Sequence, residues 1–133
     1  MWWFVVVLAA FDVGLKRVGV ALAFKGVVLP QDPIFRKNRN QAANEASLFL
    51  KNWSVDRLIV GLPTGSEDSL TMQKRVKHFI SLINFDKEIC YVDEYGSSLE
   101  AKELMRGKIK QKRDGKIDSL AAVVILNRYL SQN

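Results

Sequence analysis

Acidic side chains occur at three distant places in this sequence where the neighbouring residues are apolar. Asp12 follows an apolar run that starts at residue 2, Asp93 and Glu94 follow a second run, and Asp118 begins the last one. Carboxylates that folding brings together cannot all stay ionised without a cation. Because the chain has one cysteine and one histidine, oxygen atoms would be the ligands, and these favour Mg²⁺ or Mn²⁺ over zinc.

Each of these acids also has a simpler structural explanation. Asp12 could accept backbone N–H bonds in the turn that contains Gly14, and Asp118 could stabilise the first turn of a helix through the helix dipole. Side chains alternate along an extended strand, which sends Asp93 and Glu94 to opposite faces. Only one of these two residues is therefore expected to join a carboxylate cluster.

The length and composition indicate a single globular domain that spans residues 1–133. Hydrophobic residues make up 48% of the chain and charged residues 26%, which is typical of a folded protein with its own core. The apolar start is about half as long as the roughly 20 residues of a membrane span, and it lacks the basic segment of a signal peptide. We therefore expect a cytoplasmic protein without a membrane partner, either a monomer or a weak dimer. Cys90, the only cysteine, fits a reduced core position.

The net charge of +6 is concentrated in loops that are rich in glycine, asparagine and glutamine. A solvated surface would explain one such loop, but two basic loops on one compact domain favour a phosphate-rich partner. The basic residues expected to bind nucleic acid are Lys16, Arg17, Arg36, Lys37, Arg39, Arg106, Lys108, Lys110, Lys112, Arg113 and Lys116. The only histidine, His78, lies among basic residues of a predicted helix, and we expect no role for it.

The apolar pattern predicts an ordered series of strands and helices. Continuous apolar runs between turn residues predict strands, and apolar residues at helical spacing predict helices. The first strand is expected to end at about residue 11, and four further strands are expected at 17–23, 27–30, 58–60 and 89–92. Helices are expected at 41–53, after a cap at Ser66, after a cap at Ser97, and at 117–130.

This order predicts an α/β fold. The first three strands would form an antiparallel meander, and right-handed strand–helix–strand connections would then add two parallel strands. The result is one five-stranded mixed sheet sandwiched by helices. Ligands of such sheets gather beyond the carboxyl ends of the parallel strands, which is where the separated acids would meet.

The sequence resembles the YqgF/RuvX family over nearly its whole length. That family comprises Holliday junction resolvase-like proteins and nucleases that process the 5′ end of pre-16S rRNA, and its fold is RNase H-like. The stretches that carry the resemblance are residues 11–21 (FDVGLKRVGVA), 59–63 (IVGLP), 93–98 with Asp93-Glu94 and Ser97-Ser98, and 116–122 (KIDSLAA).

The resemblance implies a cytoplasmic phosphodiesterase that depends on a divalent metal and acts on structured RNA or branched DNA. Asp12, Glu94 and Asp118 match the family's catalytic and metal-binding acids, and Asp93 matches as an accessory residue. Metal-assisted hydrolysis would follow, with Asp12 bridging two Mg²⁺ or Mn²⁺ ions.

Three features depart from the family pattern. Tyr95 replaces an arginine that usually follows the Asp-Glu pair, and Ser97 and Ser98 stand where threonines are usual. The loop after Pro63 is short and lacks an asparagine.

The most direct prediction is a nuclease that processes the 5′ end of pre-16S rRNA in ribosome biogenesis. A DNA endonuclease of the Holliday junction type and a non-catalytic RNA-binding factor of ribosome assembly remain alternatives. A phosphotransferase of the sugar kinase and actin type also begins with a strand that ends in Asp-x-Gly. Such enzymes need two domains of this kind around a nucleotide, and 133 residues leave room for one.

Overall fold

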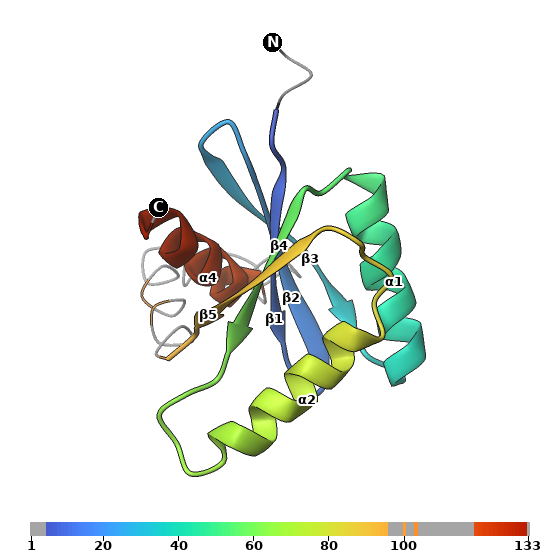
Figure 1. Ribbon diagram of the computed structural model, residues 1–133, viewed down its shortest axis with the longest axis vertical. Coiled ribbons are helices and arrows are strands. Elements are labelled where there is room, and N and C mark those ends of the chain that lie inside the picture. The colour runs from blue at the N-terminus through green and yellow to red at the C-terminus, as the bar shows by residue number, and fades with distance from the viewer. Residues whose placement is uncertain (1–4, 96–99, 101–102, 104–118, 133) are drawn as a thin grey trace, which may run out of the picture.

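Five strands form one mixed sheet in the order β3-β2-β1-β4-β5 (Figure 1). The computed structural model describes residues 5–95, 100, 103 and 119–132. The strands are β1 (Leu8–Val13), β2 (Arg17–Phe24), β3 (Val27–Phe35), β4 (Arg57–Leu62) and β5 (Glu88–Asp93). β1 pairs antiparallel with β2 and parallel with β4, and β5 extends the parallel part. The predicted meander with two added parallel strands is confirmed.

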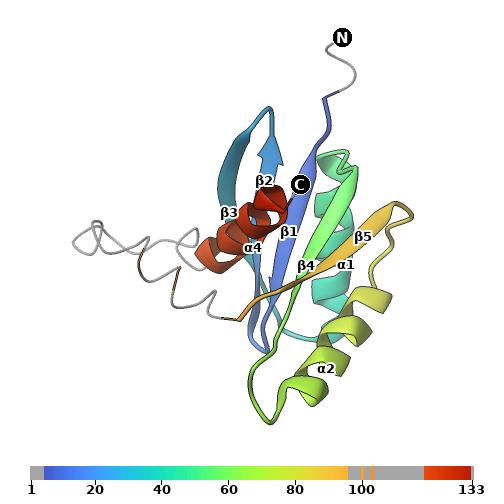
Figure 2. The same ribbon diagram turned by 60° about the vertical axis from the view of Figure 1, so that its left-hand side comes forward.

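Helices cover both faces of this sheet. They are α1 (Arg39–Asn52), α2 (Ser69–Ser81) and α4 (Leu120–Ser131). Figure 2 shows α4 on one face and both α1 and α2 on the other. The central strand β1 is therefore buried on both sides, and Ala9, Ala10 and Phe11 are all inaccessible to solvent. This burial explains why the first strand reads as a continuous apolar run rather than an alternating one.

The core consists of two apolar layers, one on each face of the sheet. Phe11 of β1 and Val60 of β4 pack with Phe79 on the α1 and α2 side. Ile59 of β4 packs with Ile125 on the α4 side. Neighbouring residues of one strand thus pack in different layers, because successive side chains point to opposite faces of the sheet.

β3 is longer than predicted, because Pro30 and Pro33 do not end it. Proline cannot donate to a strand ladder, but β3 is an edge strand and one of its sides needs no partner. The pairing shifts register between Val18 and Val20 of β2, opposite this region. The strand therefore continues to Phe35, and Arg36 follows it directly instead of lying in a long loop.

Two helix starts also differ from the prediction. α1 begins at Arg39, two residues early, because Asn38 and Gln41 form a reciprocal capping box. α2 begins at Ser69 and not directly after Ser66, whose backbone N–H instead donates to the Ser69 hydroxyl.

The last predicted helix is present as α4, which runs from Leu120 to Ser131. Its expected start at residue 117 lies outside the described residues. The capping box predicted at Ser97 lies outside the described residues, as does Asp118. Among the described helices, none combines the length and the apolar character of a membrane span.

Candidate active site

Two acidic side chains meet at the edge where the parallel strands end. Asp12 is the penultimate residue of β1 and pairs with Gly19 of β2. Glu94 follows the last residue of β5, and its backbone N–H donates to the carbonyl of Leu62 at 3.0 Å, which extends the pairing of β4 and β5 by one residue. Because β1, β4 and β5 run in the same direction, their ends bring together residues that lie 82 positions apart (94 − 12).

The carboxyl groups of Asp12 and Glu94 lie close enough to shift each other's pKa. Burial raises the pKa of Asp12, and the interaction with Glu94 opposes this rise. The pKa of Glu94 is raised to about 8, by burial first and by the neighbouring Asp12 second. Two interacting carboxyl groups favour holding one proton between them, because a second negative charge beside the first is costly.

The pair also contains an unsatisfied polar atom. The Oε2 atom of Glu94 is buried and has no hydrogen-bond partner among the described residues. A buried polar atom of this kind costs free energy unless something compensates it. Two close carboxyl groups with a free buried oxygen have the donor chemistry that suits a hard divalent cation. The described residues contain no group of three or more acidic, histidine or cysteine side chains that could hold a metal.

Gly61 of β4 makes the space that Glu94 occupies. A Cβ atom on Gly61 would lie 2.8 Å from Oε2 of Glu94 and 2.5 Å from Cδ1 of Ile125. Both separations are shorter than real contacts allow, so any larger residue would displace the carboxyl group of Glu94 and the side chain of Ile125. The glycine of the IVGLP stretch is therefore a requirement of the site.

Asp93 points away from the carboxylate pair. Its Oδ1 atom accepts the Thr64 hydroxyl at 2.5 Å and the backbone N–H of Tyr95 at 2.7 Å. The Thr64 bond, followed by the Tyr95 bond, lowers the pKa of Asp93. Of the two neighbouring acids, Glu94 is the one that interacts with Asp12. Asp93 instead ties the end of β5 to the segment after β4.

Arg128 of α4 is a residue of this region that sequence reasoning missed. Its Nη1 atom donates to the carbonyl of Asp93 at 2.9 Å, and its Nη2 atom forms an ion pair with Glu100. Its charge lowers the pKa of Glu94, against the stronger effects that raise it. The only signal in the sequence was an arginine near the end of an apolar helix. Arginines at such positions commonly serve solubility, so the pattern does not indicate a site.

Ser119 fixes the start of the last helix beside the sheet. It is fully buried, and its hydroxyl accepts the backbone N–H of Val20 at 3.0 Å, next to the register shift of β2. Val20 follows Gly19, the strand partner of Asp12. Asp118, the third predicted acid, lies outside the described residues.

Arg36 supports the turn that follows Asp12. Its guanidinium donates to the carbonyl of Gly14 and lies 4.9 Å from the centre of the Phe79 ring. Burial lowers the pKa of Arg36. In the same turn, the N–H of Gly14 donates to the carbonyl of Arg17 at 2.9 Å, and a Cβ on Gly14 would come within 2.8 Å of that oxygen. Arg36 thus has a structural task besides any contact with a ligand.

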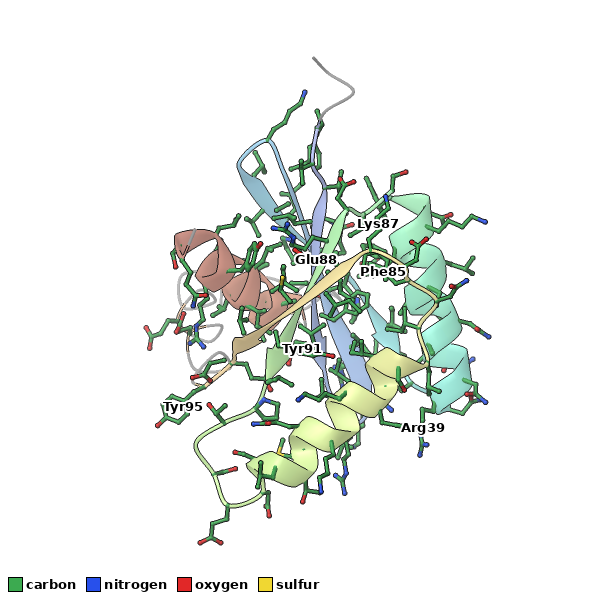
Figure 3. All side chains as sticks on the ribbon, in the orientation of Figure 1. Arg39, Phe85, Lys87, Glu88, Tyr91 and Tyr95 are labelled. Carbon is green, nitrogen blue, oxygen red and sulfur yellow. The ribbon has the colours of Figure 1, made fainter. Side chains whose placement is uncertain are left out.

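A basic groove lies beside the carboxylate pair. It has a volume of about 610 Å³ and is lined by Leu15, Arg36, Lys37, Asn38, Arg39, Asn40, His78 and Leu82. A smaller hollow of about 90 Å³ shares Leu15 and Arg36 with it and reaches Glu94. Figure 3 shows Arg39 at the start of α1, and this residue lines the groove. The groove therefore extends from the first turn of α1 to Arg36, where it adjoins the hollow that reaches Glu94.

The groove gathers predicted and unpredicted basic residues. Lys37 and Arg39 are exposed there, whereas Arg17 lies against the Phe35 ring at 5.6 Å. His78 lines the groove, and Arg75 lines the smaller hollow, although neither was expected to contribute. The remaining predicted basic residues, Arg106, Lys108, Lys110, Lys112, Arg113 and Lys116, lie outside the described residues.

The fold is that of RNase H-like resolvases. The structure aligns with the fowlpox virus Holliday junction resolvase at a TM-score of 0.60 and 12% identity, covering 96% of this chain and 99% of the other. It aligns with Thermus thermophilus RuvC, solved in complex with a Holliday junction substrate, at a TM-score of 0.59, 12% identity and 96% of both chains. At this identity the likeness defines the fold alone.

Sequence comparison defines the family. The pattern described as "RuvX: Holliday junction resolvase" matches residues 6–132, so the chain belongs to the RuvX family. A protein of Sulfurovum sp. named "Putative pre-16S rRNA nuclease" is 53% identical over 125 residues, covering 93% of this chain and 98% of its own. A protein of the same name from Campylobacter lari is 51% identical and covers 90% and 94%. The family expected from the sequence motifs is confirmed.

Proposed function

We propose that this protein is a nuclease that hydrolyses phosphodiester bonds with the help of a divalent metal. The observation that carries the proposal is the partly buried pair of Asp12 and Glu94, whose carboxyl groups interact and leave one buried oxygen without a partner among the described residues. A protein that only bound RNA would gain nothing from this costly arrangement. A divalent cation would compensate both carboxylates once the shared proton has left.

Asp12, Glu94 and Asp118 are the residues that would hold Mg²⁺ or Mn²⁺. When bound, such a metal supplies Lewis-acid activation of water and stabilises charge at the scissile phosphate. The carboxylates of this chain hold it only when deprotonated, so the Asp12 and Glu94 pair must give up its proton first. The anchoring of Ser119 beside β2 supports Asp118 as the third member.

We propose the 5′ end of pre-16S rRNA as the substrate, by analogy with the names of the relatives at about 50% identity. The basic groove supports a nucleic acid partner, because exposed lysine and arginine side chains contact phosphates without reading bases. Lys16, Lys37 and Arg39 would bind the phosphate chain that leads to the acidic pair. We further propose a cytoplasmic monomer or weak dimer.

The experiment is a cleavage assay of the purified protein with Mg²⁺ or Mn²⁺. A precursor RNA that contains the 16S 5′ end is compared with a four-way DNA junction. The substitution Asp12→Asn is expected to abolish cleavage and leave the circular dichroism spectrum unchanged. The matched control, Asp86→Asn, changes an exposed aspartate in the connection before β5 and is expected to cut like the wild type.

The outcomes separate the alternatives. Cleavage of the DNA junction alone would favour a resolvase-like endonuclease, in line with the family description. Tight RNA binding without cleavage under any metal condition would favour a non-catalytic factor of ribosome assembly. An Asp12→Asn protein that cuts as fast as the wild type would refute the assignment of the acidic pair.

A further inference from the structure

Tyr95 presents an aromatic ring to solvent one residue after Glu94 of the acidic pair. The residue is 66% exposed. Figure 3 shows it beyond the end of β5, pointing away from the sheet. An exposed aromatic ring one residue from a buried carboxyl group is not needed by the core, so its position calls for another explanation.

The backbone of Tyr95 is held in place. Its N–H donates to Oδ1 of Asp93 at 2.7 Å, and the same oxygen accepts the hydroxyl of Thr64 at 2.5 Å. The carbonyl of Asp93 accepts the Arg128 guanidinium at 2.9 Å. The segment after β4 and helix α4 thus both bond to Asp93, at the end of β5, and Asp93 in turn holds the N–H of Tyr95.

The ring itself is positioned by Gly65. A Cβ atom on Gly65 would lie 2.6 Å from Cδ2 and 2.7 Å from Cε2 of Tyr95. Gly65 also has φ +85°, a conformation that other residues rarely adopt. The absence of a side chain at this position lets one edge of the ring rest on the backbone, while most of the ring remains accessible.

We propose that Tyr95 stacks on an unpaired base next to the phosphodiester bond that the acidic pair would cleave. Aromatic side chains stack on bases of any sequence, but only where the base is not already stacked within a duplex. The substrate would then need an unpaired nucleotide at this position. This inference rests on the proposed nuclease function and adds a specificity-determining residue to it.

The chemistry of the tyrosine side chain favours a base over a phosphate as its partner. Tyr95 has no positive charge that could pair with a phosphate, and its phenol ring binds through its face. We therefore expect this contact to depend little on salt, unlike the phosphate contacts of lysine and arginine.

The test uses an RNA hairpin with a single bulged 2-aminopurine, and the same hairpin with that base paired to uridine. Ca²⁺ replaces Mg²⁺ so that binding is measured without cleavage. Wild type and Tyr95→Phe are expected to quench the fluorescence of the bulged base. Tyr95→Leu is expected to lose the quenching and to bind the bulged hairpin about 5- to 100-fold more weakly, with the paired hairpin unaffected.

A second variant and a kinetic readout exclude a merely structural role. Gly65→Ala keeps the tyrosine but pushes its ring, and we expect a partial loss of quenching with a folded circular dichroism spectrum. In cleavage assays, Tyr95→Leu should raise KM for bulged RNA and leave kcat nearly unchanged. Equal quenching and equal KM for wild type and Tyr95→Leu would overturn the stacking role.

The failure of the nuclease proposal would look different. If the wild type cleaves no RNA or DNA but its quenching still depends on Tyr95, the nuclease function falls and the stacking contact stands. If the wild type cleaves bulged and paired RNA equally and Tyr95→Leu does the same, the nuclease function stands and the stacking role falls.

Discussion

At the scale of single residues, the protonated pair of Asp12 and Glu94 makes the protein sensitive to pH. Glu94 has a folded pKa of about 8, well above its ordinary value of 4.5, because of burial first and the charge of Asp12 second. Between about pH 4.5 and pH 8 the folded state therefore binds more protons than the unfolded state. The free energy of unfolding must fall as the pH rises through this window.

This sign leads to a prediction for Glu94→Gln. The glutamine amide cannot ionise. The free energy of unfolding should therefore fall less between pH 5 and pH 8 in the variant than in the wild type. Thermal unfolding of both proteins without metal, at matched ionic strength, gives the difference directly. Added Mg²⁺ should restore the wild type at pH 8 and leave Glu94→Gln unchanged. Parallel curves for the two proteins would show that Glu94 is not buried in the protonated form.

Gly61 gives a second prediction at this scale, because its missing side chain leaves room for Glu94. We expect Gly61→Ala to lower the free energy of unfolding by about 1–3 kcal/mol through overpacking. We also expect it to cleave at least tenfold more slowly than the wild type. Urea unfolding and cleavage assays measure the two effects separately.

The double variant Gly61→Ala with Ile125→Val separates the two contacts of the added methyl group. Valine lacks the Cδ1 atom that the methyl would strike at 2.5 Å, but Glu94 Oε2 remains at 2.8 Å. Stability should therefore partly recover while cleavage stays low. Recovery of both would mean that the space beside Glu94 is not critical.

At the scale of the elements, the sequence predicted which strands and helices exist better than where they end. The order of the elements followed from the apolar pattern, and with it the convergence of Asp12 and Glu94 at one edge. The predicted end of β3 was wrong, because prolines such as Pro30 and Pro33 break a central strand but not an edge strand. Edge position depends on the order of strands in the sheet, which no local pattern contains.

The contacts of Arg128 were equally hidden from the sequence, because its partner Asp93 lies 35 residues away. Its charge lowers the pKa of Glu94, so Arg128→Met should raise that pKa further. We expect the pH midpoint of metal-dependent cleavage to move to a higher value, with little change in stability.

A matched control for Arg128 is Glu100→Gln. This change removes the ion-pair partner but leaves the guanidinium at the carbonyl of Asp93, so the midpoint should not rise. An unchanged midpoint in Arg128→Met would show that the arginine serves only the packing of α4.

At the scale of the whole molecule, the basic groove decides how the protein would meet a nucleic acid. The sequence identified Lys37 and Arg39 as basic residues, but it could not place His78 of α2 opposite them across the groove. Only the packing of α1 and α2 on the same face of the sheet brings these side chains together (Figure 2).

The groove predicts a change in the salt dependence of RNA binding. Replacing both Lys37 and Arg39 by glutamine should reduce the slope of log affinity against log salt by about 1.4 for single-stranded RNA, since each lost phosphate contact is worth about 0.7. The control replaces Lys25 of the β2–β3 turn and Lys51 of α1, which do not line the groove. Equal slopes for the two double variants would place the nucleic acid elsewhere.

The most direct test of the account is calorimetric titration of the intact protein with Mn²⁺ at pH 8, in comparison with Asp12→Asn and Asp86→Asn. We predict that the wild type and Asp86→Asn bind Mn²⁺ with release of a proton from the Asp12 and Glu94 pair, and that Asp12→Asn binds at least tenfold more weakly. Equal Mn²⁺ affinity in wild type and Asp12→Asn would contradict the claim that this buried acidic pair is a metal site.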